Sequence, residues 1–329
     1  MNIPPETFLR VPAEALRDLA TRLGAAAGLP AARAGLLAEL LTGNDLRGNV
    51  SHGTVQLATY VRLLRDGSLN PDPQVSVVRE TPTSLLVDGD GGLGYFPAYD
   101  GTRLLVAKAE QAGIAVLVTR QHGHFGAAGL YSRLTLEHDL LSFVTSGHQL
   151  TLAPGDSVAA AAGGSPMSFS APTQDEPPLL LDFGAMHDLY DDSSRDLLAG
   201  LAPGLVHRSI GLGAVCQSWG GLLAGVPLDP ARAARRWPGA NQGSMVIALR
   251  IDLFADPAEF RAEMDAYARA VRALTPLPGS SGSFLPGGPE AVTAAAYGVE
   301  GIPVGEDHRR QLEQAADDLG VTVPWNDPA

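Results

Sequence analysis

The chain has 329 residues, of which 45% are hydrophobic and 18% are charged, and its formal net charge is −13. This composition is ordinary for a globular protein and leaves room for two or three packed units. The acidic balance, without any basic cluster, argues against nucleic acid or an anionic membrane as the partner, so we expect a small-molecule ligand.

Cys216 is the single cysteine, which excludes an internal disulfide framework and gives no metal-thiolate pattern. No apolar run approaches the roughly 18 residues that a membrane-spanning helix needs. Residues 1–10 lack the charged start and the apolar stretch of a signal peptide. We therefore expect a cytoplasmic protein without a metal site.

The N-terminal part has the pattern of a helical unit, which we place at residues 1–73. Leu and Ala recur at spacings of three and four residues over 12–27, 31–46 and 55–66, which predicts three helices. The polar segment 45–53, with two glycines, connects the last two of these helices.

From residue 74 to residue 255 the pattern is that of an α/β domain. A helix is expected over 97–111. Runs of β-branched and apolar residues predict strands at 75–78, 85–87, 114–119, 140–145, 179–183 and 244–251. The remaining segment, 256–329, begins with an amphipathic helix and ends with a helix near 306–319, and we expect it to pack on the N-terminal helices.

The most informative segment joins the strand at 114–119 to a helix expected over 127–138. It contains two histidines and three glycines between residues 121 and 131. Glycines let a ligand approach the backbone closely, and α/β proteins build clefts at the carboxyl ends of their strands. His124 there can exchange a proton near neutral pH, although the same histidines can also simply hydrogen-bond the turn.

Three groups are candidates for proton chemistry: His52 between Ser51 and Gly53, His124, and Asp182 at the end of an apolar strand. An aspartate in that position can orient a histidine and favour its charged form. Each signal is weak by itself, because a histidine before a helix is often a cap and a strand-end aspartate is often a turn residue.

A series of short motifs runs through the chain. They are Asp45-Leu46-Arg47-Gly48, Ser51-His52-Gly53 with Tyr60, Val87-Asp88-Gly89, His124-Phe125-Gly126-Ala127-Ala128-Gly129 with Tyr131, Gly164-Ser165-Pro166, Asn241-Gln242-Gly243 and Gly301-Ile302-Pro303. In this order they resemble the type 2 malate/L-lactate dehydrogenase family, which includes ureidoglycolate and sulfolactate dehydrogenases and cyclic imine carboxylate reductases. The resemblance covers nearly the whole chain.

The resemblance implies a sulfolactate-dehydrogenase-like α/β fold, distinct from the Rossmann fold. In that fold a helical domain built from both chain ends accompanies a domain with a mixed sheet. The resemblance also implies a homodimer whose subunits share the active site. Members of the family transfer hydride between NADH or NADPH and a 2-oxo acid or a cyclic imine, so NAD or NADP is the expected cofactor.

By resemblance, His52 or His124 protonates the carbonyl oxygen or imine nitrogen, and Asp182 supports that acid. The resemblance also assigns binding residues around these groups. Those expected at the substrate are Arg47, Ser51, Gln56 and Tyr60. Those expected at the cofactor are His148, Ser165, Phe183, Gly184 and Gly211.

The chain departs from the family at positions that bind anions. Gln56 stands where relatives place an arginine, and Gly211 lies in a segment that lacks the lysine of relatives. The connection over 183–210 is also shorter than its counterpart. Two hypotheses follow: a divergent reductase of a carbonyl or imine in a biosynthetic intermediate, or a redox-neutral cyclase, isomerase or lyase that has lost nicotinamide binding.

Overall fold

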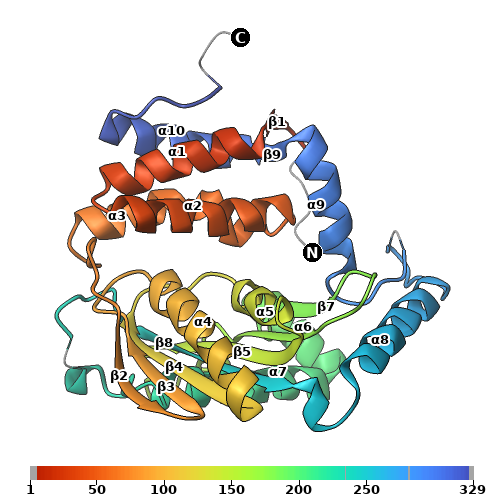
Figure 1. Cartoon of the computed structure of the whole chain (residues 1–329). Coiled ribbons are helices and arrows are strands. Elements are labelled where there is room, and N and C mark those ends of the chain that lie inside the picture. Colours follow the sequence, from red (N-terminus) through yellow and green to blue (C-terminus); the bar gives the residue numbers. More distant parts are fainter. Residues whose placement is uncertain (1–5, 234, 281, 326–329) are drawn as a thin grey trace. The chain divides into compact units, whose positions relative to one another are not determined.

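The computed structural model describes residues 6–233, 235–280 and 282–325, so the first half of the segment assessed for a signal peptide lies outside it. The chain divides into two compact units. The helical unit consists of residues 1–73 and 288–329, and the sheet unit consists of residues 74–287. Each unit is coloured along the sequence in Figure 1.

The helical unit joins the two ends of the chain through a short antiparallel sheet. Strand β1 (Phe8–Val11) pairs with β9 (Ile302–Gly305), with Val11 opposite Ile302. Leucines spaced three and four residues apart on the first two helices are buried and form the core of this unit. The helices and single turns are α1 (Ala13–Ala26), α2 (Ala31–Leu46), η1 (Val50–His52), η2 (Thr54–Gln56), α3 (Leu57–Arg65), α9 (Gly288–Glu300) and α10 (Glu306–Leu319).

The sheet unit is built on one mixed sheet with the strand order β2-β3-β4-β8-β5-β6-β7. Only β3 and β4 are parallel neighbours, and every other adjacent pair is antiparallel. The strands are β2 (Ser76–Thr81), β3 (Ser84–Asp88), β4 (Ile114–His122), β5 (Leu140–His148), β6 (Pro166–Ala171), β7 (Leu179–Gly184) and β8 (Gln242–Arg250).

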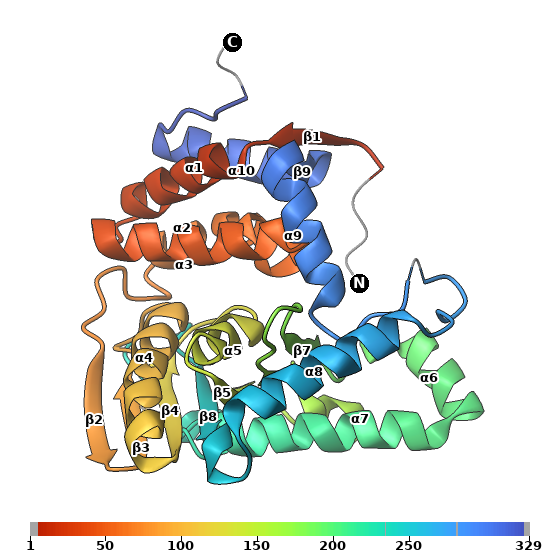
Figure 2. The ribbon, with the colours of Figure 1, turned by 45° about the vertical axis from the view of Figure 1, so that its right-hand side comes forward.

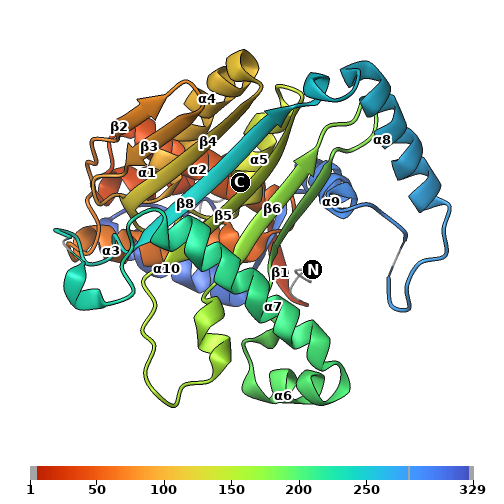
Figure 3. The same ribbon diagram turned by 90° about the horizontal axis from the view of Figure 1, so that it is seen from below.

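Helices cover both faces of this sheet. Helices α4 (Tyr95–Ala112) and α5 (Gly129–Leu136) lie on one face, and α7 (Pro203–Cys216) crosses the other, as Figure 3 shows. Figure 2 shows α6 (Asp192–Leu201) beside α7. The remaining short elements are η3 (Val158–Ala162), η4 (His187–Leu189), the π-helix η5 (Gln217–Leu222), η6 (Pro230–Arg232) and η7 (Ile251–Leu253).

The topology gathers four strand ends at one edge of the sheet. Strands β3 and β4 are parallel, β4 and β5 both run antiparallel to the β8 strand between them, and β7 runs in the direction of β5. The carboxyl ends of β3, β4, β5 and β7 therefore lie together. We call this edge, with the loops that leave it, the carboxyl edge.

All six strands expected in the α/β domain are present, but the sequence missed β6 and the helices of the 183–210 connection. Strands β4 and β5 also continue three residues past their predicted ends. Their polar last residues still pair with β8, since His122 and His148 both lie opposite Gln242. The apolar pattern from which a strand is predicted ends where the side chains become polar, whereas the backbone hydrogen bonds between strands continue past that point.

The helix α8 (Pro257–Arg272) corrects the expected domain boundary at residue 255. The sequence placed it with the C-terminal helices, but the structure groups residues up to 287 with the sheet unit. Asp265 of α8 is buried and accepts the backbone N–H groups of Gln174, Asp175 and Glu176 at 3.0–3.2 Å. This carboxylate fastens α8 to the loop between β6 and β7.

Removing that carboxylate is expected to destabilise the sheet unit. In Asp265→Ala the three N–H groups lose their charged acceptor, which costs about 3 kcal/mol of unfolding free energy. Urea denaturation measures this loss. The control is Glu263→Ala, an exposed carboxylate on the same helix, which should change stability by less than about 0.5 kcal/mol. Equal effects of both substitutions would contradict the anchoring role.

Candidate active site

Two glycine-rich segments at the carboxyl edge are joined by their backbones. The turn after β3 donates from Gly89, Gly91 and Gly94 to the carbonyls of residues 120, 121 and 124, each at 2.9 Å. In return, Gly123 donates to Gly92 at 2.9 Å. A Cβ on Gly94 would lie 2.6 Å from the Gly123 oxygen. The turn therefore needs glycine in order to support the loop that carries His124.

The first histidine of this loop, His122, is structural. It is fully buried, with Nδ1 2.7 Å from the Gly123 carbonyl oxygen and Nε2 2.7 Å from the Thr119 hydroxyl. A carbonyl oxygen only accepts, so Nδ1 carries the proton and Nε2 accepts from Thr119. Burial lowers the pKa of His122 from 6.5 to about 4, which keeps the ring neutral.

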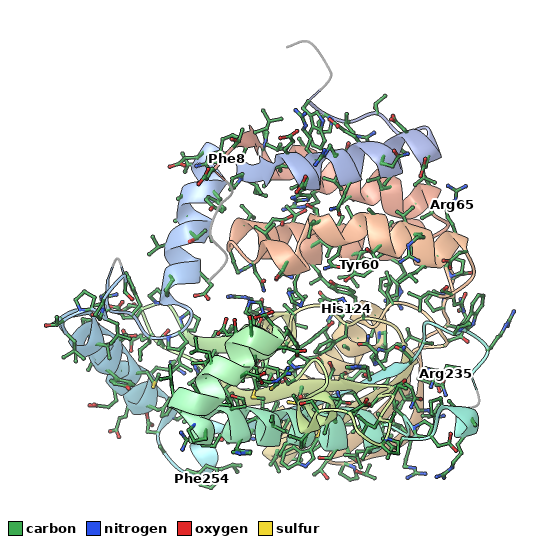
Figure 4. All side chains as sticks on the ribbon, turned by 180° about the vertical axis from the view of Figure 1, so that it is seen from behind. Phe8, Tyr60, Arg65, His124, Arg235 and Phe254 are labelled. Atoms are coloured by element: carbon green, nitrogen blue, oxygen red, sulfur yellow. The ribbon has the colours of Figure 1, made fainter. Side chains whose placement is uncertain are left out.

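The second histidine, His124, lies on the loop after β4 and is partly accessible to solvent. Figure 4 marks it in the sheet unit, and its side chain is half-buried. Its ring meets the buried ring of Tyr95 edge to face, with centroids 6.4 Å apart. The neighbouring Phe125 stacks on Tyr131 at 5.3 Å, and the Tyr131 hydroxyl donates to the Phe125 carbonyl. These contacts fix the loop on both sides of His124.

The carboxylate of Asp182 lies beside the first residue of α5, the helix that follows this loop. Asp182 sits in β7 opposite Ser168, and a Cβ on Gly129, the first residue of α5, would be 2.6 Å from its carboxylate oxygen Oδ2. The positive end of a helix dipole favours a carboxylate at that position. The sheet unit thus brings Asp182 and the His124 loop to the same helix terminus. Tyr95, whose ring contacts that of His124, was not predicted as part of this site.

The residues expected at the cofactor fall into two groups. Ser165, Phe183 and Gly184 lie together where β6 begins and β7 ends, since Phe183 pairs with Met167 and the Ser165 hydroxyl accepts from the Met186 backbone at 3.0 Å. Gly211 does not join them. Its Cα faces open space on the exposed side of α7.

His148, at the end of β5, is held by a residue that the sequence analysis missed. The Gln217 side chain accepts from the His148 backbone N–H at 3.1 Å and lies 3.4 Å from its ring Nδ1. Burial lowers the pKa of His148. Gln217 belongs to the π-helix η5. The two adjacent glycines of this element, Gly220 and Gly221, are the feature of the sequence that indicates close packing there.

That packing closes one part of the carboxyl edge. A Cβ on Gly220 would lie 2.4–2.6 Å from the backbone of Ser146 and Gly147, so η5 rests directly on β5. Beside it, the connection over 183–210 folds into α6 and α7. Apolar side chains of α7 form a buried cluster with η3 and the η4 region, and Leu198 of α6 packs against it; the cluster consists of Ala162, Met186, Leu189, Val206 and Ile210.

Backbone strain marks the same edge. Four non-glycine residues of the described chain have positive φ. Three of them lie at the carboxyl edge: Asp90 and Ser165 in its loops, and Gln121 near the end of β4. Such conformations cost about 1 to 3 kcal/mol and persist where the surrounding structure enforces them, often at functional sites. Gly164, next to Ser165, has no atom closer than 3.9 Å to a Cβ position, which leaves its backbone open to a ligand.

The helical unit holds the other predicted residues around a buried aspartate. Asp45 is fully buried and accepts from the Thr54 backbone N–H at 2.9 Å and from its hydroxyl at 2.7 Å. The same hydroxyl lies 3.1 Å from Nε2 of His308. Burial raises the pKa of Asp45 to about 7 and lowers that of His308 to about 4.

This network fixes the turn that carries His52. The Asn44 side chain donates to the His52 carbonyl at 2.8 Å, and the Ser51 hydroxyl lies 3.1 Å from the ring Nδ1 of His52. A Cβ on Gly53 would be 1.7 Å from an oxygen of Asp45. The motif Ser-His-Gly therefore needs its glycine in order to pack on the aspartate.

The three remaining substrate candidates turn back onto the helical unit. Gln56 donates to the Ser51 carbonyl at 2.7 Å, and Arg47 donates to the Gly43 carbonyl at 2.6 Å. Tyr60 is only 1% exposed. The structure thus brings Ser51, His52 and Gln56 together on two consecutive turns, η1 and η2, and it gives Tyr60 a place in the packed interior.

The described part of the chain contains no group of three His, Cys, Asp or Glu residues that could hold a metal ion. None of its helices is long and apolar enough to cross a membrane.

Comparisons with known proteins agree with this architecture. A sequence model of the family described as malate/L-lactate dehydrogenase matches residues 11–186 and 190–313. The solved malate dehydrogenase of Pyrococcus horikoshii OT3 has a TM-score of 0.86 and 25% identity, covering 98% of this chain and 99% of that one. The expected fold, a mixed-sheet domain with a helical unit from both chain ends, is therefore confirmed.

Sequence similarity to curated proteins is uneven along the chain. Malate dehydrogenase of Pyrococcus horikoshii is 34% identical over 175 residues, which span only 49% of that protein and 53% of this chain. A protein described as ureidoglycolate dehydrogenase (NAD(+)), from Escherichia coli O157:H7, is 23% identical over 326 residues, with 91% of this chain and 93% of that protein covered.

The buried His122 should make stability depend on pH. Its folded pKa of about 4 lies below the unfolded value of 6.5, so the unfolded state binds more protons and stability falls as the pH drops below 6.5. Between about pH 7 and pH 5 this costs about 2 kcal/mol. His122→Gln should remove that part of the slope, measured by urea denaturation across the range. Parallel pH profiles of the two proteins would contradict a neutral, buried His122.

The contact between Gly53 and Asp45 should make that glycine irreplaceable. Gly53→Ala places a methyl group on the buried carboxylate and is expected to cost about 2 to 3 kcal/mol. Gly35→Ala is the control, because nothing lies within 4 Å of a Cβ at this position of α2. It should stabilise the protein by about 1 kcal/mol. Thermal or urea unfolding measures both effects, and a harmless Gly53→Ala would rule out the tight packing.

Proposed function

Because this chain belongs to the malate/L-lactate dehydrogenase family, we propose that it is an NAD(P)H-dependent oxidoreductase acting on a carbonyl or imine in a small biosynthetic intermediate. The observation that carries the proposal is the family match over 11–186 and 190–313, which includes the carboxyl edge with His124 and Asp182. One relative bears NAD(+) in its name, and others are malate or sulfolactate dehydrogenases.

The carboxyl edge has features that fit a nicotinamide cofactor. Ser165 is held in a strained conformation beside Gly164, whose backbone is open, and Gly184 lies next to both at the end of β7. These residues, with Phe183 and His148, are proposed to hold the cofactor. When bound, the nicotinamide supplies or accepts the hydride. Of the five residues that the family resemblance assigns to the cofactor, Gly211 has the least structural support, because it faces open space.

His124 is the residue proposed to move the proton. In the direction of reduction, hydride adds to the carbonyl or imine carbon, and the electron pair of the double bond moves to oxygen or nitrogen. His124 would give its proton to that atom and would be recharged from solvent. Asp182 is proposed to favour the charged form of the ring from the terminus of α5. His52 of the helical unit is the second candidate for this proton.

The substrate is proposed to differ from a simple 2-oxo acid. Gln56 replaces the cation expected there, and its amide already donates to the Ser51 carbonyl. A neutral amide cannot form the bidentate ion pair by which an arginine holds a carboxylate. Ser51 and Gln56 would instead hydrogen-bond a neutral polar group. We further propose a cytoplasmic homodimer with a shared active site, as the family resemblance implies.

A redox-neutral reaction is the alternative, and one observation favours it. The π-helix η5 and the apolar cluster fill the part of the carboxyl edge beside His148. A cyclase, isomerase or lyase would use the same histidines without a nicotinamide. Calorimetric titration with NADH and with NADPH separates the two proposals. Micromolar affinity for either supports the oxidoreductase, and no binding at millimolar concentration would favour the alternative.

The proton-transfer role of His124 makes its own prediction. His124→Gln should lower kcat by about 100-fold or more, because a neutral amide cannot supply the proton. Nicotinamide affinity and melting temperature should stay near the wild-type values. Turnover is followed by NADH or NADPH absorbance with the carbonyl or imine that substrate screening identifies.

His138→Gln is the matched control for this measurement. His138 lies on the surface of the same unit and pairs with Glu110 at 2.8 Å. Its substitution should leave kcat unchanged. If His124→Gln retains the wild-type turnover, another group is the proton donor. The variant His52→Gln would then be measured next.

A further inference from the structure

A small cavity opens at the carboxyl edge, and none of the residues assigned above is in its lining. Its volume is about 200 Å³, and it lies between the end of β4, the start of β8 and the loop that connects η5 to β8. Pockets for whole drug-sized ligands measure about 300 to 1,000 Å³. This cavity is therefore suited to one small charged or polar group rather than to a complete dinucleotide.

The lining of this cavity is cationic in a strongly acidic chain. Among the described residues that line it, Arg232 and Arg235 are the charged ones, and the polar ones are the amides Gln121, Asn241 and Gln242. No carboxylate of the described chain lines it. The chain as a whole has a formal charge of −13. The two arginines therefore give this cavity a local charge opposite in sign to the net charge of the chain.

One of these arginines is held in place without neutralisation. The Arg235 guanidinium donates to the side-chain oxygen of Gln149 at 2.6 Å. The Gln149 amide nitrogen donates in turn to the carbonyls of Pro227 and Leu228, which tethers the loop beside β5. Burial lowers the pKa of Arg235, and the group still remains fully protonated at neutral pH. Arg235 is thus a fixed positive charge; its position on the loop is labelled in Figure 4.

Two further contacts fix the loop that carries the arginines. Asp229 caps the short turn η6, accepting from the Ala231 backbone at 2.9 Å, and Arg232 ends that turn. The Trp237 ring packs so closely on Gly91 that a Cβ there would be 2.0 Å from it. The described part of this loop therefore has a capped turn at Arg232 and a contact with the Gly89–Gly94 turn through Trp237.

The opposite wall of the cavity carries backbone strain. Gln121 has a φ of +53° and lies within an irregularity of the β4–β8 ladder between Thr119 and His122. Bulges and positive φ at non-glycine residues occur preferentially beside functional sites. The cavity therefore combines two arginines, one of them held by Gln149, with amide donors and a strained wall.

We propose that this arginine cavity, lined by Arg232 and Arg235, binds an oxyanion, namely the phosphate or carboxylate group of a small molecule. Guanidinium groups recognise both anions through paired hydrogen bonds, and side-chain amides add further donors. The site supplies anion contacts in a chain that lacks a cation at position 56.

Calorimetric titration with inorganic phosphate, and separately with succinate, tests the proposal without any nicotinamide. The double variant R232Q/R235Q is expected to bind the preferred anion at least about ten-fold more weakly than the wild type. The matched control is Arg236→Gln on the same loop, whose guanidinium lies over the Trp237 ring and does not line the cavity. It should retain the affinity.

Melting temperatures verify that all three proteins are folded. No anion binding by the wild type at about ten millimolar, or equal loss in the control and the double variant, would overturn the proposal.

A second titration identifies the source of the anion and rests on the proposed oxidoreductase function. If the site holds the 2′-phosphate of NADPH, R232Q/R235Q should lose affinity for NADPH and keep its affinity for NADH, whereas a site for the pyrophosphate, which both cofactors carry, should lose affinity for both. If it holds a substrate carboxylate, both nicotinamide affinities should persist while KM rises about ten-fold or more. Failure of the wild type to bind either nicotinamide would contradict the proposed function, and the phosphate and succinate titration would still decide the anion site.

Discussion

Direct backbone contact between two glycine-rich segments is the constraint on which the carboxyl edge depends. The turn Gly89–Gly94 and the segment after β4 exchange hydrogen bonds at 2.9 Å, with no room for a side chain at Gly94. On the other side of the sheet, Gly147 and Gly220 allow the same kind of approach between β5 and η5. Glycine at these points replaces side-chain packing by backbone packing, which fixes the loops rigidly and leaves selected side chains to face a ligand.

Both units also bury a polar group beside the segment that carries a candidate histidine. In the sheet unit it is the neutral His122, and in the helical unit it is Asp45. Their pKa shifts oppose each other. Acidification toward pH 5 destabilises the fold through His122, whereas the raised pKa of Asp45 makes its burial less costly as the pH falls below about 7. Each unit thus stabilises its histidine-bearing turn with a group that is uncharged in part of the physiological range.

Much of the fold was readable from the sequence because it rests on apolar periodicity and on motifs. Six of the seven strands of the sheet and the helices of the N-terminal unit follow from that periodicity. What the sequence could not show depends on contacts between distant segments. The place of α8 in the sheet unit follows from one carboxylate, Asp265, that accepts three backbone N–H groups. The arginine cavity depends on Gln149, which lies 86 residues from Arg235 in the chain.

The two histidines at the end of β4 show most clearly why site residues needed the structure. Regular alternation from the buried Thr119 would turn residue 121 inward and residue 122 outward. The irregularity in the β4–β8 ladder, with Gln121 at positive φ, shifts the alternation by one residue and buries His122. His124 then follows on the loop, beside Tyr95, with its ring half-buried. The same distortion that buries His122 therefore forms a wall of the arginine cavity, so the loop that carries His124 and this cavity share a single structural cause.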